Sequence, residues 1–284
     1  MNRRRWPLFA ALSLLAACSG TERTGPGALG GATGGAPTIE RPETVSTAPT
    51  TGAACVQNID IVFVMDVSSS MGPFLTKLAQ EISVVDSALM AMSPGAAPYY
   101  GLAVFVDETK ILNNGQPFAN VPTLRAEFER WAKLTYQNRQ LDNPEQNSTW
   151  PENSLDAIYG AASTFAWRPG SLRVVIHTTD DTFWEGPTTA DGIAVQRNYA
   201  ETVTKLKNEQ VRVFSFAAQR GGPNEADDVS AGWFVPYKGA DPIPKATFGG
   251  VFEIEKVVAG QLSLSDSIKG AVQSVLCAPY PKVN

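Results

Sequence analysis

Oxygen-bearing side chains gather in three short segments of this sequence. The first is DVSSSMG, in which Asp66, Ser68 and Ser70 follow one another at intervals of two residues. The second covers residues 147–157 (NSTWPENSLDA), and the third covers residues 178–181 (TTDD). Carboxylate and hydroxyl oxygens are hard ligands, which suit Mg²⁺ or Ca²⁺ better than soft metals. The spacing in the first segment lets one turning loop direct three oxygens to a common centre.

An alternation of strand-like and helix-like patterns predicts that these segments meet. It indicates an α/β fold with a doubly wound, mostly parallel sheet, one short antiparallel edge strand and helices on both faces. Ligands of such sheets bind outside the carboxyl ends of the strands, where the three segments fall. The expected strands are 59–65, 100–106, 110–112 (the antiparallel edge), 172–178, 211–217 and 250–254; the expected helices are 74–92, 123–134, 153–165, 190–208 and 265–276; a long loop covers 221–247.

The same motifs resemble a known family. DVSSSMG resembles the DxSxS loop of von Willebrand factor A (VWA) domains, whose metal ion-dependent adhesion site binds Mg²⁺. PENSLDAI is similar to a segment of the A-like domains of integrin β proteins, and RVVIHTTDD to the strand and loop that carry the family's last metal-binding Asp. The resemblance extends over residues 58–276 and implies a VWA, Rossmann-like fold. It implies that Ser68 and Ser70 ligate the ion directly. Asp66 and Asp180 would act through water or orient the hydroxyls.

The resemblance leaves two residues open for the remaining protein ligand. Glu152 matches the integrin β pattern, and Thr149 matches the commoner Thr pattern of the family. We favour Glu152, because the Pro-Glu dipeptide and the downstream Asp156 match that pattern together. The competing interpretation is a capping box, in which Thr149 caps a helix and Glu152 reaches back. We expect Asp156 to be structural and Asp181 to be a solvent-exposed neighbour of the site.

Integrin β-type domains flank the central ion with two others, and the sequence departs from both patterns. One flanking site uses acids directly after the DxSxS loop, where this chain has Pro-Phe. The matching positions for the other are Asp107, Asn147, Thr149 and the carbonyl of Pro151. Thr149 there supplies a neutral hydroxyl in place of a carboxylate. Since Ca²⁺ affinity depends on the number of charged ligands, we expect this secondary metal site to be weak or empty.

The N-terminal residues indicate export. Three arginines (3–5) precede a short apolar run that ends in small residues, the layout of a secretion signal. The LAAC at its end resembles the lipobox of bacterial lipoproteins, which implies a signal peptide over 1–17 and lipidation of Cys18. An ordinary signal peptide with a chance cysteine is the alternative. Residues 18–54, rich in Gly, Thr, Ala and Pro, predict a disordered tether that joins the domain, 55–280, to the bacterial outer membrane or cell surface.

Two cysteines remain at the edges of the predicted domain. An even pair in an oxidising compartment indicates a disulfide between Cys55 and Cys277. The alternative is that both remain free thiols.

The function classes are narrowed by what the sequence contains. A net charge of −5 without a basic stripe gives no reason to expect nucleic acid. The only histidine, His177, lies within a strand pattern, which indicates a residue of the core. The sequence contains neither the GxSxG elbow of serine hydrolases nor the Gly-rich loop that binds phosphate. We therefore expect a binding module for adhesion or envelope assembly and no enzyme activity.

Serine hydroxyls are neutral, so a bound Mg²⁺ (or Mn²⁺ or Ca²⁺) would keep positive charge and bind an acidic side chain of a protein partner. A metal-free structural scaffold and, further behind, a metal-dependent hydrolase are the alternatives.

Overall fold

A six-stranded sheet forms the centre of the domain. The computed structural model describes residues 57–220 and 228–282 of the chain. The strand order is β3-β2-β1-β4-β7-β8; β3 runs antiparallel to β2, and the other neighbouring pairs are parallel. This is the predicted doubly wound fold class, VWA-like and Rossmann-like, because six strands numbered consecutively have the order 3-2-1-4-5-6. The strands are β1 (Ile59–Asp66), β2 (Tyr99–Phe105), β3 (Thr109–Ile111), β4 (Leu172–Thr179), β7 (Val211–Ala217) and β8 (Gly250–Glu253).

The central strands are buried on both faces. All eight residues of β1 are buried, as are all seven of β7, which explains why both read as nearly continuous apolar runs. Successive side chains alternate between the two faces. Phe63 therefore packs in the core on one side of the sheet, and Val62 and Val64 pack in the core on the other.

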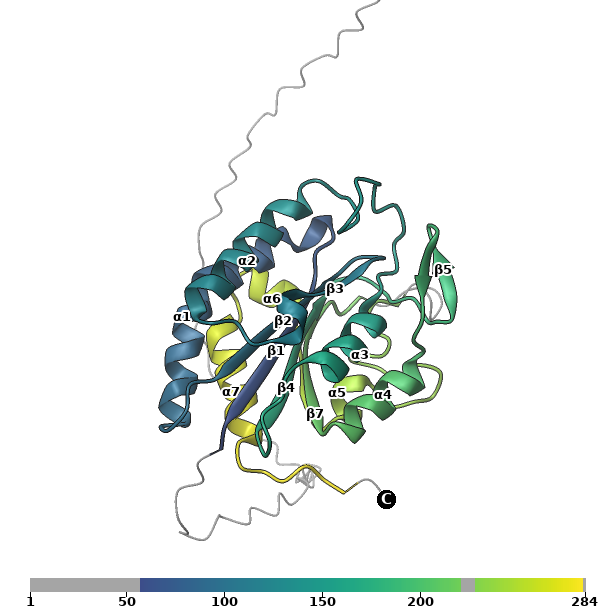
Figure 1. The fold of residues 1–284 in the computed structure, drawn as a ribbon. Helices are drawn as coiled ribbons and strands as arrows, with labels where there is room; N and C mark the ends of the chain where they lie inside the picture. Colours follow the sequence, from purple (N-terminus) through teal and green to yellow (C-terminus); the bar gives the residue numbers. More distant parts are fainter. Residues whose placement is uncertain (1–56, 221–227, 283–284) are drawn as a thin grey trace, which may run out of the picture. The chain divides into compact units, whose positions relative to one another are not determined.

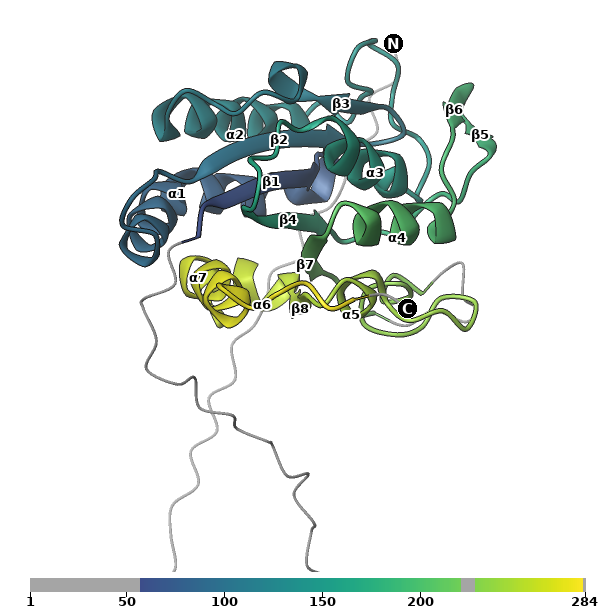
Figure 2. The same ribbon diagram turned by 60° about the horizontal axis from the view of Figure 1, so that its bottom comes forward.

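Helices cover both faces of the sheet (Figure 1). α1, α2 and α7 supply the core on one face, and α3, α4 and α5 supply the core on the other. The second view separates the two layers (Figure 2). The short α6 belongs to the α1 face, where its Ile254 and Val257 are buried. The helices are η1 (Ser69–Met71), α1 (Gly72–Met92), η2 (Leu112–Gly115), α2 (Val121–Thr135), α3 (Ser154–Thr164), α4 (Tyr199–Asn208), α5 (Ile243–Ala246), α6 (Ile254–Val258) and α7 (Leu264–Val275).

The prediction of one helix over 190–208 is wrong in its first half. Thr188–Ala190 (β5) pairs antiparallel with Ile193–Val195 (β6), and α4 begins only after this hairpin. Asp191 and Gly192 at the turn have φ values of 46° and 83°. Asp-Gly is a preferred hairpin turn because both residues tolerate positive φ, and this local preference overrides the helical spacing of the apolar residues.

The remaining predicted elements that the structure describes lie within two residues of their expected bounds. The segment predicted as a long loop, 221–247, also departs from expectation, because its last residues form α5.

The end of the domain lies against its beginning. The Cys277 backbone N–H donates to Gln57 Oε1 at 3.1 Å. Cys277 is disulfide-bonded, and both other cysteines lie outside the described residues, so the pairing with Cys55 stays a prediction. The predicted signal peptide, lipidated cysteine and tether (within residues 1–54) also lie outside them. Across the described part of the chain, none of the helices combines the length and apolarity that a membrane span requires.

One buried ion pair ties the entry of β1 to the loop before β4. The Asp60 carboxylate is fully buried and lies 2.6 Å from Arg168 Nη2. Arg168 Nε donates to the same carboxylate at 2.7 Å, and its Nη2 also donates to the Ile59 carbonyl at 2.8 Å. Removing one partner of such a pair leaves an uncompensated buried charge.

We therefore predict that Arg168→Ala lowers the free energy of unfolding by about 3–5 kcal/mol, measured by urea denaturation. The control is Asp60→Asn combined with Arg168→Ala, which removes the charge along with its partner and should lose less than the single variant. An equal loss in both would contradict the electrostatic explanation.

Candidate metal centre

The three polar segments meet at the carboxyl ends of β1 and β4. Parallel pairing aligns Met65 with Thr178, so the residues that follow in each strand reach the same edge of the sheet. Glu152 joins them through the backbone, because its N–H donates to the Thr182 carbonyl at 2.9 Å. All three segments line one cavity of about 420 Å³.

Asp66 organises the loop after β1. Its Oδ1 accepts from the Ser68 backbone N–H, and its Oδ2 accepts from the Thr179 hydroxyl, both at 2.8 Å. The hydroxyl oxygens of Ser68 and Ser70 lie 3.3 Å apart. Ser70 Oγ in turn donates to Asp180 Oδ1 at 2.7 Å. The structure thus brings together the serines and the two aspartates that the sequence predicted to share a site.

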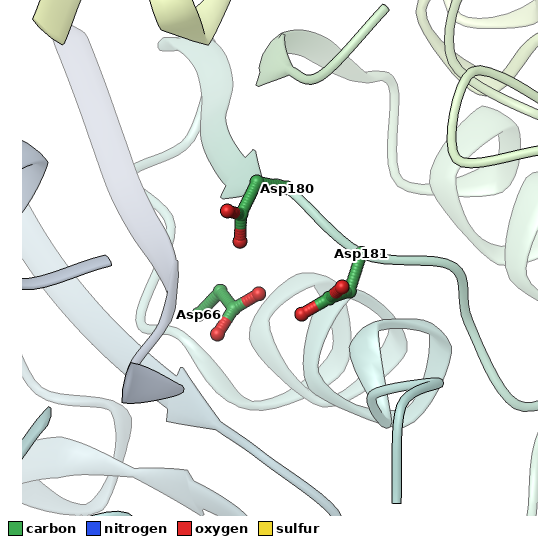
Figure 3. A group of neighbouring side chains, drawn as sticks. All are labelled: Asp66, Asp180 and Asp181. Carbon is green, nitrogen blue, oxygen red and sulfur yellow. The ribbon is translucent and has the colours of Figure 1, made fainter. Parts of the chain in front are cut away.

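Three carboxylates, Asp66, Asp180 and Asp181, form what we call the acidic cluster. Their oxygens lie within 4.8 Å of one another, and Figure 3 shows the carboxylates facing a common space. Burial, and then the charges of Asp180 and Asp181, raise the pKa of Asp66 well above its ordinary value. Burial and the Asp180 charge raise the pKa of Asp181 to about 7, although the nearby Arg220 acts in the opposite direction. Burial, and after it the negative charge of the neighbouring carboxylates, therefore governs the electrostatics of this site.

Asp181 is the main acid that sequence reasoning undervalued. It was expected to be a solvent-exposed neighbour, but it is partly buried and belongs to the acidic cluster. The signal for it in the sequence is its position directly after Asp180, at the end of a buried strand.

Glu152 has an unusual environment for a carboxylate. The residue is 1% exposed, and its Oε1 accepts from Asn147 Nδ2 at 2.8 Å. Its Oε2 is buried and has no hydrogen-bond partner within the part of the chain that the structure describes. Burial is the largest cause that raises the pKa of Glu152, followed by the charge of Asp66. A buried carboxylate oxygen without a donor is costly, so this oxygen marks a place where a positively charged ligand would be stabilised.

The capping-box interpretation of Glu152 is wrong. Helix α3 begins at Ser154, and its N-cap residue, Asn153, makes no side-chain capping bond. The Thr149 hydroxyl, which would cap the helix in that interpretation, instead donates to Asp107 Oδ1 at 2.6 Å. The Glu152 and Thr149 side chains therefore form hydrogen bonds with different residues, Asn147 and Asp107.

Asp107, Gln140, Asn147 and Thr149 form a second polar centre beside the first. Gln140 Nε2 donates to Asp107 Oδ2 at 2.8 Å and to Asn147 Oδ1 at 3.3 Å. Trp184 Nε1 donates to Asp107 Oδ1 at 3.1 Å. Neutral N–H and O–H groups thus reach the oxygens that a secondary cation would need. Sequence reasoning missed Gln140, because this residue belongs to no motif.

Two residues outside the site have structural roles, as the sequence predicted. His177 is fully buried between the rings of Phe105 and Trp233. Its Nδ1 lies 2.8 Å from Ser215 Oγ, and burial lowers its pKa to about 3. Asp156 accepts from the backbone N–H groups that precede α4.

The donor set at the first centre fits a hard divalent cation. Ser68 and Ser70 offer neutral hydroxyl oxygens, Glu152 offers an unpartnered carboxylate oxygen, and the acidic cluster supplies negative charge. Asp66 and Asp180 orient the hydroxyl groups through the bonds given above. The second centre fits a cation less well, because both carboxylate oxygens of Asp107 already accept hydrogen bonds from neutral donors.

Comparison with known proteins gives little further guidance. No protein-family model matches the chain, and no curated protein matches it either. A solved structure of an aerotolerance-related membrane protein from Bacteroides fragilis NCTC 9343, with multiple mutations to serines, is similar at 15% identity and a TM-score of 0.42. The alignment covers 76% of this chain and 100% of that one. A likeness at this level adds nothing to the description of the site.

Proposed function

We propose that this chain is a divalent-metal-dependent protein-binding module. Ser68, Ser70 and Glu152 would hold Mg²⁺, with Mn²⁺ or Ca²⁺ as substitutes, while Asp66 and Asp180 orient the ligands. The metal would supply a positive centre that accepts a carboxylate from a protein partner. The observation that carries this proposal is the buried Glu152 Oε2, which no described residue partners, beside the acidic cluster.

The charge balance of the site supports a cation. The pKa values of three carboxyl groups, Asp66, Glu152 and Asp181, are raised, and burial is the largest cause for each. A divalent ion would remove much of that penalty, since metal binding and carboxylate deprotonation are coupled. Two of the three proposed direct ligands are neutral hydroxyls, so the direct ligands would cancel only one of the ion's two charges and would leave it able to bind a partner's carboxylate.

The rim of the cavity suits contact with a protein. Trp150 lines it and is 67% exposed, which is unusual for so large an aromatic side chain on a free surface. Arg220 lines the same cavity. Trp and Arg are enriched among residues that dominate protein–protein binding energy.

The proposed location follows from the N-terminal motifs. Lipid on Cys18 would anchor the protein to the outer membrane or cell surface, and residues 18–54 would tether the domain. Adhesion and envelope assembly are the roles that fit such a module. A metal-free scaffold is the principal alternative, and a hydrolase is the second; metal titration tests the first, and a turnover assay tests the second.

We also propose that the second polar centre works without a metal. Gln140 and Thr149 already donate to Asp107, and Asn147 links the centre to Glu152. These neutral groups would position Glu152 in place of a second ion.

The metal site is tested by calorimetric titration of the purified protein with Mg²⁺. Asp66→Asn keeps the shape of the side chain but removes its charge, and we expect it to weaken Mg²⁺ binding about 10- to 100-fold. Asp241→Ala, which removes an exposed acid paired with Lys245, is the control and should bind like the wild type. Equal affinity in the wild type and Asp66→Asn would reject the site.

Metal affinity should depend on pH with a known sign. A raised pKa means that Asp181 is largely protonated below about pH 7 and must lose its proton before its charge attracts the cation. Mg²⁺ affinity should therefore rise by about tenfold or more between pH 6 and pH 8. In Asp181→Asn the affinity at pH 8 should be lower and its dependence on pH shallower. A wild-type affinity that is flat over this range would contradict the proposed proton release.

The second centre is tested with Ca²⁺. Thr149→Asp replaces a hydroxyl donor with a carboxylate next to Asp107, and should create a tighter Ca²⁺ site while Mg²⁺ binding at the first centre is unchanged. Thr149→Val, which removes the same hydroxyl without adding charge, should gain no site. Two tightly bound divalent ions in the wild-type protein, counted by calorimetric stoichiometry, would contradict the assignment.

A further inference from the structure

A second cavity adjoins the proposed metal centre on the side of α1 and α6. It has a volume of about 250 Å³ and shares Ser70 and Asp180 with the cavity of the acidic cluster. Cavities that enclose drug-sized ligands begin at about 300 Å³. This one has the size to receive part of a larger ligand, such as one side chain of a protein.

The lining of this cavity is mainly apolar. Met71, Phe74 and Ile254 line it and are each at most 3% exposed. Val258 and Ala259 belong to the same lining and are exposed. Val258 is 48% exposed, so a branched apolar side chain faces water beside a hollow that has an apolar floor.

Arg220 lies at the junction of the two cavities. Its Nη2 donates to the Asp180 carbonyl at 2.8 Å, and its Nε lies 3.6 Å from Glu255 Oε1 in the lining of the second cavity. Its side chain is 57% exposed, so the guanidinium remains accessible. A carboxylate that approaches the metal would thus meet a second positive group, and the residue next to it would lie over the apolar cavity.

We propose that this cavity receives an apolar side chain adjacent to the partner's metal-binding acid, so that the recognised feature is an acidic residue beside a branched aliphatic one. The proposal rests on the metal-dependent capture of a carboxylate proposed above. An aliphatic occupant fits because a polar side chain would exchange water for an apolar lining without compensation. The negative charges of Asp180 and Glu255 disfavour a second acid there.

The test uses small carboxylates as probes. Ligand-observed NMR titrations of the full chain with Mg²⁺ would compare acetate with 4-methylpentanoate, which carries a leucine-like tail. Burial of two or three methyl or methylene groups should make the longer acid bind about tenfold or more tightly. Ala259→Phe, which fills the cavity, should abolish this preference but leave acetate binding unchanged. Val84→Phe, which enlarges an exposed residue on α1 that is not part of the lining, is the matched control and should retain the preference.

The outcomes separate this proposal from the one on which it rests. Mg²⁺-dependent acetate binding without any preference for the longer acid would overturn the apolar subsite alone. A preference that persists in Ala259→Phe would place the tail elsewhere and also overturn it. If neither probe binds in a Mg²⁺-dependent manner, carboxylate capture itself fails, and the subsite fails with it.

Discussion

Uncompensated negative charge at the carboxyl ends of β1 and β4 is the constraint on which the rest of this site depends. The parallel pairing of the two strands brings Asp66 close to the Asp180-Asp181 pair, and burial removes the water that would screen their charges. Such a group of carboxylates must take up protons or bind a cation. The raised pKa values of Asp66 and Asp181 correspond to the uptake of protons. A bound divalent ion would be the second, and it would release the protons that the metal-free site retains.

In the second polar centre, a buried carboxylate is stabilised by hydrogen bonds from neutral groups. Asp107 is also fully buried, but both of its carboxylate oxygens accept from neutral donors, among them Gln140 and Thr149. Asn147 belongs to this centre and also donates to Glu152. One oxygen of Glu152 thus accepts a hydrogen bond from this centre, while the other has no partner among the described residues. In the proposed function, this division leaves one of these two centres for a cation, in contrast to the adjacent ions of the integrin β-type pattern.

Local patterns predicted most of the fold, because buried parallel strands have long apolar runs and their helices repeat at 3.6 residues. They failed at residues 190–198, where the Asp-Gly turn preference overrides the apolar spacing. In the site, motifs pointed to the serines, Asp66, Asp180 and Glu152. The role of Gln140 could not be predicted from the sequence, because its hydrogen bond with Asp107 joins residues 33 apart in the chain and depends on how a loop packs. The burial of Asp181 is likewise a tertiary property that no spacing encodes.

A metal ion alone would provide little discrimination, because any accessible carboxylate can bind a positive centre. Selectivity must therefore come from the surroundings of the ion. Much of those surroundings comes from chain segments other than the DxSxS loop: Trp150 from the loop before α3, Arg220 from the segment after β7, and part of the apolar wall from α6. The residues that would hold the metal are held by hydrogen bonds with Asp66, Asp180 and Asn147. Trp150, Arg220 and Val258, by contrast, are exposed side chains at the rim. If the proposed metal centre captures a partner, exchange of these rim residues would alter the choice of partner while the geometry of that centre is kept.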